Sequence, residues 1–468
     1  MSGPLFSRLA APDDRPALRF GRDVLTYRQL ARACRAYLAG LGASPGERVA
    51  VWTHPCAMTP VVLAAHAAAG IVSVPLDPKL GDAARAHVLA DAAPARVIDP
   101  RALEPALDPS GALPLAEVGE APLLVLYTSG TTGPPKGAVI SGKNVAFDLD
   151  ALAAAWEWSA LDTVVHALPL FHVHGLVLGL YGALRAGGAL HWLERFEPAR
   201  LARALGEDAS TLLFSVPTMV HRLATEAEED VEIARALGAA RLWISGSAGL
   251  PVREHRRVEA ATGRGILERY GLTETLIDCA VRATDGPRPG SVGRPLDGVA
   301  LRLVDDERRP LDARDDVTIG EVAIRGDNVF CGYLGRPGAT AEVLDADGWF
   351  YTGDLATRAA DGAIRIVGRR STDLIKTGGY KVGAGEVEAA LLEDPAVAEV
   401  AVVGAPDDDL GERIVAFVVA RGEVAAEALV ERVASSLTPH KRPREVRFVD
   451  ALPKNAMGKV QKRRLLAP

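Results

Sequence analysis

A run of small, hydroxylated and basic residues at positions 127–137 is the part of this chain best suited to chemistry. It reads Tyr-Thr-Ser-Gly-Thr-Thr-Gly-Pro-Pro-Lys-Gly and follows the apolar segment Pro122–Leu126, whose composition predicts a buried strand. Its glycines allow sharp turns, and its N–H and O–H groups can converge on an anion such as a nucleotide phosphate. It is not a Walker A loop, because Pro135-Lys136-Gly137 stands where Gly-Lys-Ser/Thr is required. The expected phosphate ligands are Thr128, Ser129, Gly130, Thr131, Thr132 and Lys136.

The order of hydroxyls, glycines and lysine in this run resembles the phosphate-binding signature of the AMP-forming acyl-adenylate synthetases. That superfamily includes acyl-CoA synthetases, peptide-synthetase adenylation domains and beetle luciferases. Further motifs follow in the superfamily's order, and the resemblance extends from Leu25 to Lys462. It implies that a carboxylate attacks the α-phosphorus of ATP and releases pyrophosphate, and that a thiol then displaces AMP. A carboxylate with a pKa of about 4 is already ionised at neutral pH, so the first step needs no general base.

The run Tyr270-Gly-Leu-Thr-Glu274 follows the predicted strand Gly265–Glu268 and resembles the superfamily's adenylate motif. The resemblance implies that Tyr270 faces the adenine, that Thr273 contacts phosphate, and that Glu274 holds Mg²⁺, a hard cation that takes carboxylate and phosphate oxygens. An isolated run of this kind is more often a turn at the end of a strand.

A serine-containing loop at positions 245–251 has a different interpretation from the one its composition first suggests. It lacks the Gly-x-Ser-x-Gly spacing of a hydrolase nucleophile, because Ser245 stands where glycine is needed. In the superfamily this loop lines the adenine and acyl pockets, which implies that Gly246, Ser247 and Ala248 are pocket backbone.

Two separated polar residues resemble the superfamily's ribose clamp. In such a clamp a carboxylate accepts hydrogen bonds from both ribose hydroxyls and an arginine donates to them; the matching residues are Asp354 in Tyr351-Thr-Gly-Asp354 and Arg369 in Gly368-Arg369. Both runs are also common turn sequences.

The run Pro453-Lys-Asn-Ala-Met-Gly-Lys459 resembles the catalytic loop that presents a lysine, here Lys459, to the α-phosphate. A lysine this near a terminus is usually only solvated. The same resemblance implies that a lysine acyltransferase could switch the enzyme by acylating Lys459, since acylation removes the charge.

The identity of the acid depends on Arg269, which directly precedes Tyr270. A cation there suits a short dicarboxylate, whose far carboxylate needs a partner once it is desolvated. A solvated arginine at the end of a strand is the alternative. His174 and Ser247 could add donors, and no third ligand at useful spacing turns the His172–His174 pair into a zinc site.

The runs Phe-His-Val-His-Gly-Leu, Ser-Gly-Ser-Ala-Gly-Leu-Pro and Glu-Arg-Tyr-Gly-Leu-Thr-Glu-Thr together resemble malonyl-CoA synthetases, including those that accept methylmalonate. The resemblance implies ligation of malonate to CoA with ATP and Mg²⁺. It also places along the pantetheine tunnel Gly378, Gly379 and Tyr380, where glycine permits close backbone approach. Arg413 and Lys441 are only guesses for contacts to the CoA phosphates.

Four other functions share some of these features. Another short-chain or aryl acyl-CoA synthetase would want an apolar acyl tunnel. A stand-alone peptide-synthetase adenylation domain should bring a carrier domain and an acidic residue for an amino group, whereas this chain stops soon after its lysine loop. Nothing marks the oxidative pocket of a luciferase, and the presence of Glu274 and Lys459 disfavours a non-catalytic nucleotide sensor.

The elements that must position these residues alternate between strands and helices, a pattern of parallel sheets covered by helices. Thr26 and Gln29 form a capping box before the amphipathic run Tyr27–Leu41. We expect an α/β fold, with a large N-terminal adenylate-forming domain of βαβ layers over residues 1–368. From about Ser291 we expect this domain to be rich in β-strands and to form a small barrel-like subdomain.

A small, mobile α+β C-terminal domain that carries the catalytic lysine is expected over residues 369–468. In the superfamily resembled here, this domain swivels at the boundary between the two half-reactions. The segment Arg370-Ser371-Thr372 is one residue longer than the usual hinge, which leaves the pivot residue open.

The overall composition is that of a globular protein, with 48% hydrophobic and 24% charged residues among 468. A net charge of −7 argues against nucleic acid or an anionic membrane as a partner. The four cysteines are scattered and predict reduced, mostly buried thiols. No export signal is evident near Arg8 and Asp13, and the most apolar stretches are interrupted by histidine or arginine, so we expect a cytoplasmic protein with small-molecule partners. The oligomeric state stays open.

Overall fold

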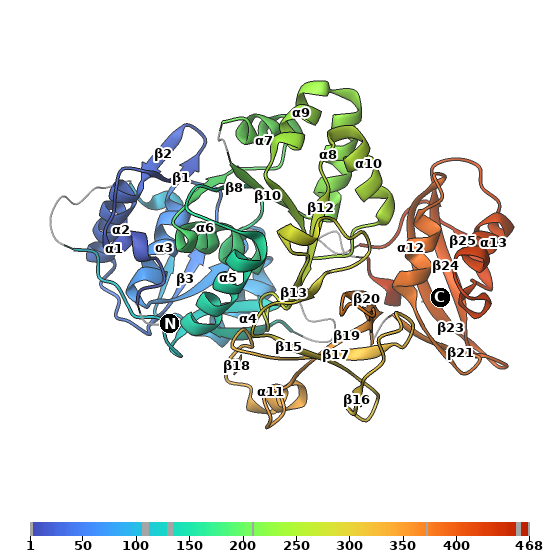
Figure 1. Cartoon of the computed structure of the whole chain (residues 1–468). Coiled ribbons are helices and arrows are strands. Elements are labelled where there is room, and N and C mark those ends of the chain that lie inside the picture. Colours follow the sequence, from blue (N-terminus) through green and yellow to red (C-terminus); the bar gives the residue numbers. More distant parts are fainter. Residues whose placement is uncertain are drawn as a thin grey trace.

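The computed structural model describes residues 3–104, 112–128, 134–207, 210–370, 373–454 and 460–466, without the side chains of Lys381 and Arg463. These residues form four sheets of nine, six, five and five strands. In Figure 1 the two largest sheets make up the left and upper parts of the molecule, a third sheet lies below them, and the fourth lies to the right.

The nine-stranded sheet has a parallel centre with antiparallel edges. The six strands from β12 to β1 pair in parallel, whereas β2 and the pair β13 and β14 are antiparallel to their neighbours. Helices α8 (Pro217–Glu229), α9 (Val231–Ala239) and α10 (Val252–Thr262) lie at the top of this sheet in Figure 1. The order is β14 (Arg294–Pro295), β13 (Cys279–Ala280), β12 (Ile266–Tyr270), β11 (Leu242–Ser245), β10 (Thr211–Ser215), β8 (Thr163–His166), β9 (Ala189–Trp192), β1 (Pro16–Phe20), β2 (Asp23–Thr26).

The six-stranded sheet carries the predicted phosphate loop. Its strands β5, β3, β4 and β6 are parallel, and β7 and β18 continue it antiparallel. Because β6 and β7 form a hairpin, Thr128 and Lys136 are direct cross-strand neighbours. The order is β18 (Gly332–Tyr333), β7 (Lys136–Ser141), β6 (Pro122–Thr128), β4 (Val72–Leu76), β3 (Arg48–Trp52), β5 (Arg96–Ile98).

Local sequence accounts for the helices that support these sheets. Helix α2 (Tyr27–Leu41) begins with the predicted capping box, in which Thr26 Oγ1 accepts from the Gln29 N–H and Gln29 Oε1 accepts from the Thr26 N–H. It ends where Gly42 adopts a φ of 62°, the left-handed conformation that glycine tolerates best. Helix α3 (Met58–Ala69) is almost entirely buried and packs against α2 and β4, which explains why it is apolar on all sides.

The remaining helices follow the alternation that the sequence predicts. Helix α5 (Gly142–Trp156) starts at a second capping box, formed by Ser141 and Asn144. The other α-helices of the large part are α1 (Ser7–Ala10), α4 (Asp82–Ala92), α6 (Gly182–Ala186), α7 (Pro198–Leu205) and α11 (Pro337–Val343). The chain also forms the π-helix η2 (His174–Tyr181) and the 3₁₀ turns η1 (Pro100–Ala102), η3 (Ala283–Asp285), η4 (Pro439–Lys441) and η5 (Lys462–Arg464).

The β-rich region forms a linear antiparallel sheet below the two larger ones (Figure 1). Its last strand carries Arg369, which is paired in register with Asp354. Strand β20 therefore extends one residue past position 368, where the N-terminal domain was expected to end. The order is β16 (Pro310–Leu311), β15 (Ala300–Val304), β17 (Gly320–Arg325), β19 (Phe350–Arg358), β20 (Ile364–Arg369).

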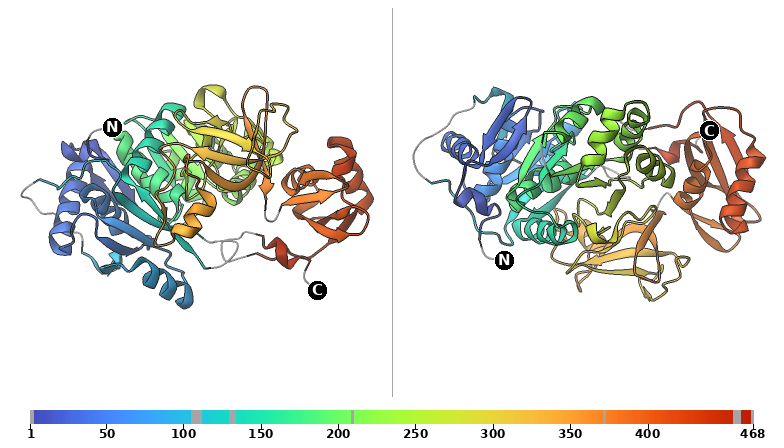
Figure 2. Two further views of the ribbon diagram at one scale, coloured as in Figure 1. Left: turned by 90° about the horizontal axis from the view of Figure 1, so that it is seen from below. Right: turned by 45° about the horizontal axis from the view of Figure 1, so that its top comes forward.

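The C-terminal sheet has a hydrophobic core of its own, distinct from the main core. Figure 2 shows this unit at one end of the molecule, opposite the N-terminus. It touches the large part through Arg253 of α10, whose Nη1 donates to the carbonyl of Val397 at 3.1 Å, and through the ion pair of Arg256 with Glu393. Its elements are β21 (Leu374–Thr377), β22 (Tyr380–Gly383), α12 (Ala384–Leu392), β23 (Val397–Asp407), β24 (Gly411–Ala420), α13 (Ala426–Ser436) and β25 (Glu445–Phe448).

The cysteines and the apolar helices complete the description. All four cysteines are free; Cys34 and Cys279 are buried and Cys56 is partly buried. Cys331 is exposed, so the expectation of mostly buried thiols is wrong for this residue, which lies beside the short edge strand β18. Across the described ranges, no helix combines the length and apolar character needed to cross a bilayer.

Candidate active site

The motif residues meet where the parallel strands of the largest sheet end. Strands β11 and β12 are parallel neighbours, with Ser245 opposite Glu268. The loop after β11, which carries Gly246 and Ser247, therefore lies beside Arg269 and Tyr270 at the end of β12. Loops beyond the carboxyl ends of parallel strands are the usual ligand sites of such sheets.

Arg269 is buried without a charged partner. Its side chain is 6% exposed, and no described carboxylate lies within ion-pair distance of its guanidinium. The nearest polar contact is a long one, from Nη2 to Ser247 Oγ at 3.4 Å, and Nε has no hydrogen-bond partner. Burial lowers the pKa of Arg269 to about 10, although the more distant Asp148 carboxylate opposes this shift. A desolvated cation of this kind is costly unless an anion joins it.

Two histidines near Arg269 also have ring nitrogens without partners. His174, the first residue of the π-helix, is 5% exposed, and neither of its nitrogens is hydrogen-bonded. His166 Nδ1 accepts from the Leu168 N–H at 3.0 Å, while its Nε2 has no partner. Burial lowers the pKa of both rings, to about 3 for His166, and Arg269 lowers that of His174 further. Both rings are therefore neutral at physiological pH.

These groups are held together by one aromatic ring and two glycines. The rings of His174 and His166 lie 5.5 and 6.4 Å from Phe214, measured between centroids. A Cβ on Gly246 would come within 2.6 Å of Arg269 Cζ, and one on Gly179 within 2.1 Å of His166 Nε2. A side chain at Gly179 would clash with the His166 ring, and one at Gly246 would require the end of the Arg269 side chain to shift.

We call the surroundings of Arg269, His174, His166, Ser245 and Ser247 the acyl pocket. Ser245 Oγ is a further buried polar atom without a partner, and Ser247 lies at the exposed side of the group with a φ of 74°, a conformation that is strained for a residue with a side chain. Buried polar atoms without partners are rare in native proteins. Such a concentration indicates a site for a polar ligand.

The predicted adenine and ribose residues form a closed network. Tyr270 donates its hydroxyl hydrogen to Asp354 Oδ2 at 2.7 Å, and Arg369 Nε lies 2.7 Å from Asp354 Oδ1. Arg369 Nη1 also donates to the carbonyl of Thr352 at 3.0 Å. Burial, reinforced by the Asp354 charge, raises the pKa of Tyr270 well above its usual range, so its hydroxyl stays a donor. Ala248 is exposed on the loop beside this network.

Only some of the residues predicted to bind phosphate or Mg²⁺ lie within the part of the chain that the structure describes. Lys136 Nζ lies 4.7 Å from the centroid of the Tyr333 ring, and the Tyr333 hydroxyl donates to Glu274 Oε1 at 2.8 Å. Thr273 is partly exposed beside Glu274. Outside the described residues lie Ser129, Gly130, Thr131 and Thr132 of the loop, Ser371 and Thr372 of the predicted hinge, and Lys459.

The residues predicted to contact CoA are not brought to the acyl pocket. Gly378 and Gly379, with φ values of 56° and 81°, form the tight turn between β21 and β22. Tyr380 is 54% exposed and stacks on His440 with ring centroids 4.0 Å apart. Within the described part of the chain, the contacts of these residues stay inside the C-terminal unit. Arg413 and Lys441 are paired there with Glu445 and Glu386.

Sequence reasoning missed three residues of the site, namely His166, Ser245 as a pocket hydroxyl, and Tyr333. His166 ends the buried strand Thr-Val-Val-His, directly after two valines, a signal that could have been used. Tyr333 is 59 positions from Glu274, and no spacing in the sequence links the two.

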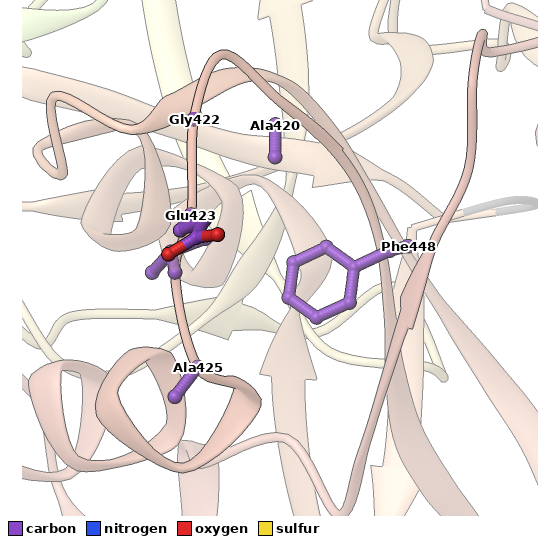
Figure 3. Close-up of a pocket in the computed structure, with 6 residues that line it drawn as sticks. Ala420, Gly422, Glu423, Ala425 and Phe448 are labelled. Carbon is purple, nitrogen blue, oxygen red and sulfur yellow. The ribbon is translucent and has the colours of Figure 1, made fainter.

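Two open hollows of the surface lie away from the acyl pocket. One, of about 520 Å³, is formed in the C-terminal unit around Phe448 and Glu423 (Figure 3). Another, of about 530 Å³, lies beside Tyr333 and is bordered by Cys331 and Thr340. Neither is lined by Arg269 or Asp354. Across the described residues there is also no group of three potential metal-ligating side chains.

Comparison with known proteins defines the class. Residues 5–334 match the AMP-binding enzyme family, and residues 386–459 match the AMP-binding enzyme C-terminal domain. The chain therefore belongs to the AMP-binding enzymes, the adenylate-forming superfamily, as its motifs predict, and its α/β fold with a small α+β C-terminal unit is that of the superfamily.

Several of the similar proteins are named as malonate–CoA or malonyl-CoA ligases. The malonate–CoA ligase of Arabidopsis thaliana is 36% identical over 371 residues, which are 74% of this chain and 60% of that protein. The chain spans about three fifths of the length of the first curated plant relatives it matches, 61% and 60%. A malonyl-CoA ligase solved as a ternary product complex with methylmalonyl-CoA and AMP is 51% identical, with 96% of this chain and 100% of that one covered and a TM-score of 0.73.

The ATP-bound MatB of Rhodopseudomonas palustris is only 32% identical but has a TM-score of 0.86, with 99% of this chain and 98% of that one covered. The chain therefore superposes better on the more distant, ATP-bound relative than on the more similar product complex.

Proposed function

We propose that this protein is a malonate–CoA ligase that forms a malonyl-adenylate from malonate and ATP and then transfers the malonyl group to CoA. The observation that carries the proposal is Arg269, a buried guanidinium with no described carboxylate within ion-pair distance. A ligand carboxylate would complete it. The names of the relatives, which include malonate–CoA ligases and a malonyl-CoA ligase, support the same substrate.

The acyl pocket suits a short diacid held at both ends. One carboxylate would attack the α-phosphorus, while the other would accept hydrogen bonds from Arg269 and Ser247. His174, being neutral, can donate one N–H to that carboxylate and needs no counter-ion of its own. Methylmalonate would need room for only one more methyl group. A fatty or aryl acid is disfavoured, because its apolar chain would leave the cluster of buried polar atoms unsatisfied.

Glu274 is the residue we propose for Mg²⁺. Its carboxylate is 9% exposed, and Oε1 already accepts from Tyr333, which leaves Oε2 for a metal. One carboxylate together with phosphate oxygens and waters is the ligand set that Mg²⁺ prefers. When bound, the ion would neutralise charge on the triphosphate. Thr273, Thr128, Lys136 and the loop residues 129–132 would bind the phosphates, and the Tyr270–Asp354–Arg369 network would bind the nucleoside.

We further propose Lys459 as the catalytic cation at the α-phosphate and a division of the chain at residues 368 and 369. Under this proposal the C-terminal domain swivels, so that Gly378, Gly379 and Tyr380 replace Lys459 at the site when CoA enters. The better superposition on the ATP-bound relative than on the product complex supports more than one domain placement. Acylation of Lys459 by a lysine acyltransferase would abolish its charge. We propose a cytoplasmic location.

The proposed substrate can be tested by magnesium-dependent ATP–pyrophosphate exchange. Acetate, malonate, methylmalonate, succinate and octanoate should be offered separately to the purified protein. We expect exchange with malonate, and with methylmalonate if the methyl group fits, because only these acids place a second carboxylate at the reach of Arg269. A maximum at octanoate would refute malonate as substrate while leaving the adenylate chemistry in place.

The role of Lys459 can be tested by separating the half-reactions. Lys459→Ala should abolish exchange with malonate, because the charge developing at the α-phosphorus loses its cation. Transfer from supplied malonyl-adenylate to CoA should remain largely intact. Equal loss in both assays would contradict the proposed exchange of domain positions.

A further inference from the structure

Tyr333 connects two motif residues that are far apart in the sequence. It lies on the edge strand β18, opposite Ala138 of β7 and thus close to Lys136 at the start of that strand. The ring lies beneath the Lys136 ammonium, at 4.7 Å from Nζ to the centroid, and the hydroxyl donates to Glu274 Oε1 at 2.8 Å. One side chain thus contacts both the phosphate-loop lysine and the carboxylate of the adenylate motif.

The surroundings of Tyr333 restrain its backbone and one side of its ring. Its backbone N–H donates to Thr340 Oγ1 at 2.9 Å, and the next residue, Leu334, donates its N–H to the carbonyl of Gly137 at 2.8 Å. The Phe330 ring packs against Tyr333 in a T-shaped arrangement, with 4.9 Å between centroids. The Phe330 ring, together with the backbone hydrogen bonds of Tyr333 and Leu334, leaves the Tyr333 side chain little rotamer freedom.

The same segment also fixes the backbone of the adenylate motif. The Phe330 N–H donates to the carbonyl of Glu274 at 2.8 Å. The backbone and the carboxylate of Glu274 are therefore both held by residues 330–333. This doubled attachment goes beyond what packing of an edge strand requires.

The two contacts of Tyr333 have different physical effects. A hydrogen bond to a carboxylate is stronger than one between neutral groups, and it occupies Oε1 while leaving Oε2 of Glu274 available. The ring attracts the Lys136 ammonium through its quadrupole.

We propose that Tyr333 is a positioning residue for nucleotide binding, which orients the free oxygen of Glu274 toward the metal of MgATP through its hydroxyl and holds Lys136 at the phosphates through its ring. The inference rests on the proposed function only in taking ATP as the nucleotide; the acid plays no part in it. Tyr333 acts through Glu274 and Lys136 rather than on the reacting atoms.

Two substitutions separate the hydroxyl from the ring. Tyr333→Phe removes only the donor to Glu274 and keeps the surface under Lys136. Tyr333→Leu removes both. Tyr37→Phe is a matched control, because Tyr37 is also partly buried and also has one side-chain hydrogen bond, to His66 at 2.8 Å, but lies outside the proposed site.

The test is equilibrium binding of ATP by titration calorimetry, without malonate or CoA, once with Mg²⁺ and once with excess chelator. Loss of one hydrogen bond to a carboxylate should weaken MgATP binding by Tyr333→Phe about three- to tenfold. Its binding of metal-free ATP should equal that of the wild type. Tyr333→Leu should weaken binding in both conditions, and Tyr37→Phe in neither.

Three outcomes would overturn the proposal. Unchanged MgATP binding by Tyr333→Phe would show that the hydroxyl does not position Glu274, and tighter binding would show that it competes with the metal. Equal weakening with and without Mg²⁺ would indicate a merely structural effect, which thermal unfolding of the variant would register as well. The proposed function fails separately, through wild-type exchange that does not respond to malonate.

Discussion

Two arginines of the site, Arg269 and Arg369, face opposite electrostatic situations. Arg369 is paired with Asp354 at 2.7 Å, and its guanidinium is 38% exposed. Arg269 is 6% exposed and has no ion-pair partner among the described residues. The network of Tyr270, Asp354 and Arg369 thus has a hydrogen bond and an ion pair without any ligand, whereas the charge of Arg269 in the acyl pocket has no ion-pair partner among the described residues. A protein tolerates an unpaired buried charge where a ligand supplies the opposite charge, so the incomplete region is the better guide to the charge of the ligand that we propose.

The largest expected effect comes from removing the unpaired arginine. Arg269→Leu should lower kcat/KM for malonate by a factor of about 30 to about 5,000, which corresponds to about 2–5 kcal/mol of lost transition-state stabilisation, because the far carboxylate would be buried without a cation. Steady-state kinetics with varied malonate measure this directly. Arg269→Lys keeps the charge but loses the forked geometry, so its kcat/KM for malonate should fall between those of the wild type and Arg269→Leu. Near wild-type efficiency of Arg269→Leu with malonate would show that the guanidinium does not bind the acid.

A smaller effect is expected from breaking the paired region. Asp354→Asn removes the charge that holds Arg369 and weakens the acceptor for Tyr270, and it should raise KM for ATP about tenfold, close to 1.4 kcal/mol. KM for malonate should stay constant. The exposed pair of Asp361 with Arg288 offers the control Asp361→Asn, which should change neither constant. If Asp354→Asn impaired malonate and ATP alike, the two regions would not be separable.

The acyl pocket should also limit stability at acid pH. The folded pKa of His166 is about 3 and its unfolded pKa is about 6.5, so below pH 6.5 the unfolded chain binds the extra proton. Stability is fully present above pH 6.5 and is lost as pH falls toward 3, by about 1.4 kcal/mol per pH unit from this one ring.

The variant that isolates this effect is His166→Asn, whose amide oxygen can still accept from the Leu168 N–H. Buried Asp148 and Asp278 have raised pKa values and contribute with the opposite sign, so the quantity to measure is the difference between wild type and variant. Chemical denaturation at pH 5 to 7 should show the wild type losing stability more steeply. Parallel slopes would show that His166 binds a proton equally in both states.

The smallest expected effect concerns stability at neutral pH. Because Arg269 is buried without a partner, Arg269→Leu should leave the ligand-free protein as stable as the wild type or more stable by about 1 kcal/mol. Arg369→Leu should destabilise it, since Asp354 would lose its cation. Thermal unfolding without ligands compares the two. A clear loss of stability in Arg269→Leu would mean that the arginine is compensated inside the protein after all.

Much of the fold was predictable from local pattern. The helix Tyr27–Leu41 occurs with the expected bounds, because its capping box and its amphipathic pattern both act over a few residues. The strand expected at Gly265–Glu268 instead spans Ile266–Tyr270. End positions depend on pairing partners that the local sequence does not contain.

The motif residues were also found from order and spacing, and the structure brings together those that it describes: Tyr270, Asp354 and Arg369 in one network, and Arg269 and Ser247 in another. The family membership inferred from them is confirmed. The roles assigned to Lys459 and to the loop residues 129–132 stay predictions.

Sequence alone determined which chemical groups this protein possesses and the family to which it belongs, because motifs of this superfamily are contiguous and keep their order. Only the tertiary structure decided which charges are left without partners. Whether Arg269 meets a carboxylate, or Tyr333 reaches Glu274 across 59 positions, depends on burial and on strands paired from distant parts of the chain, and neither is encoded in local spacing.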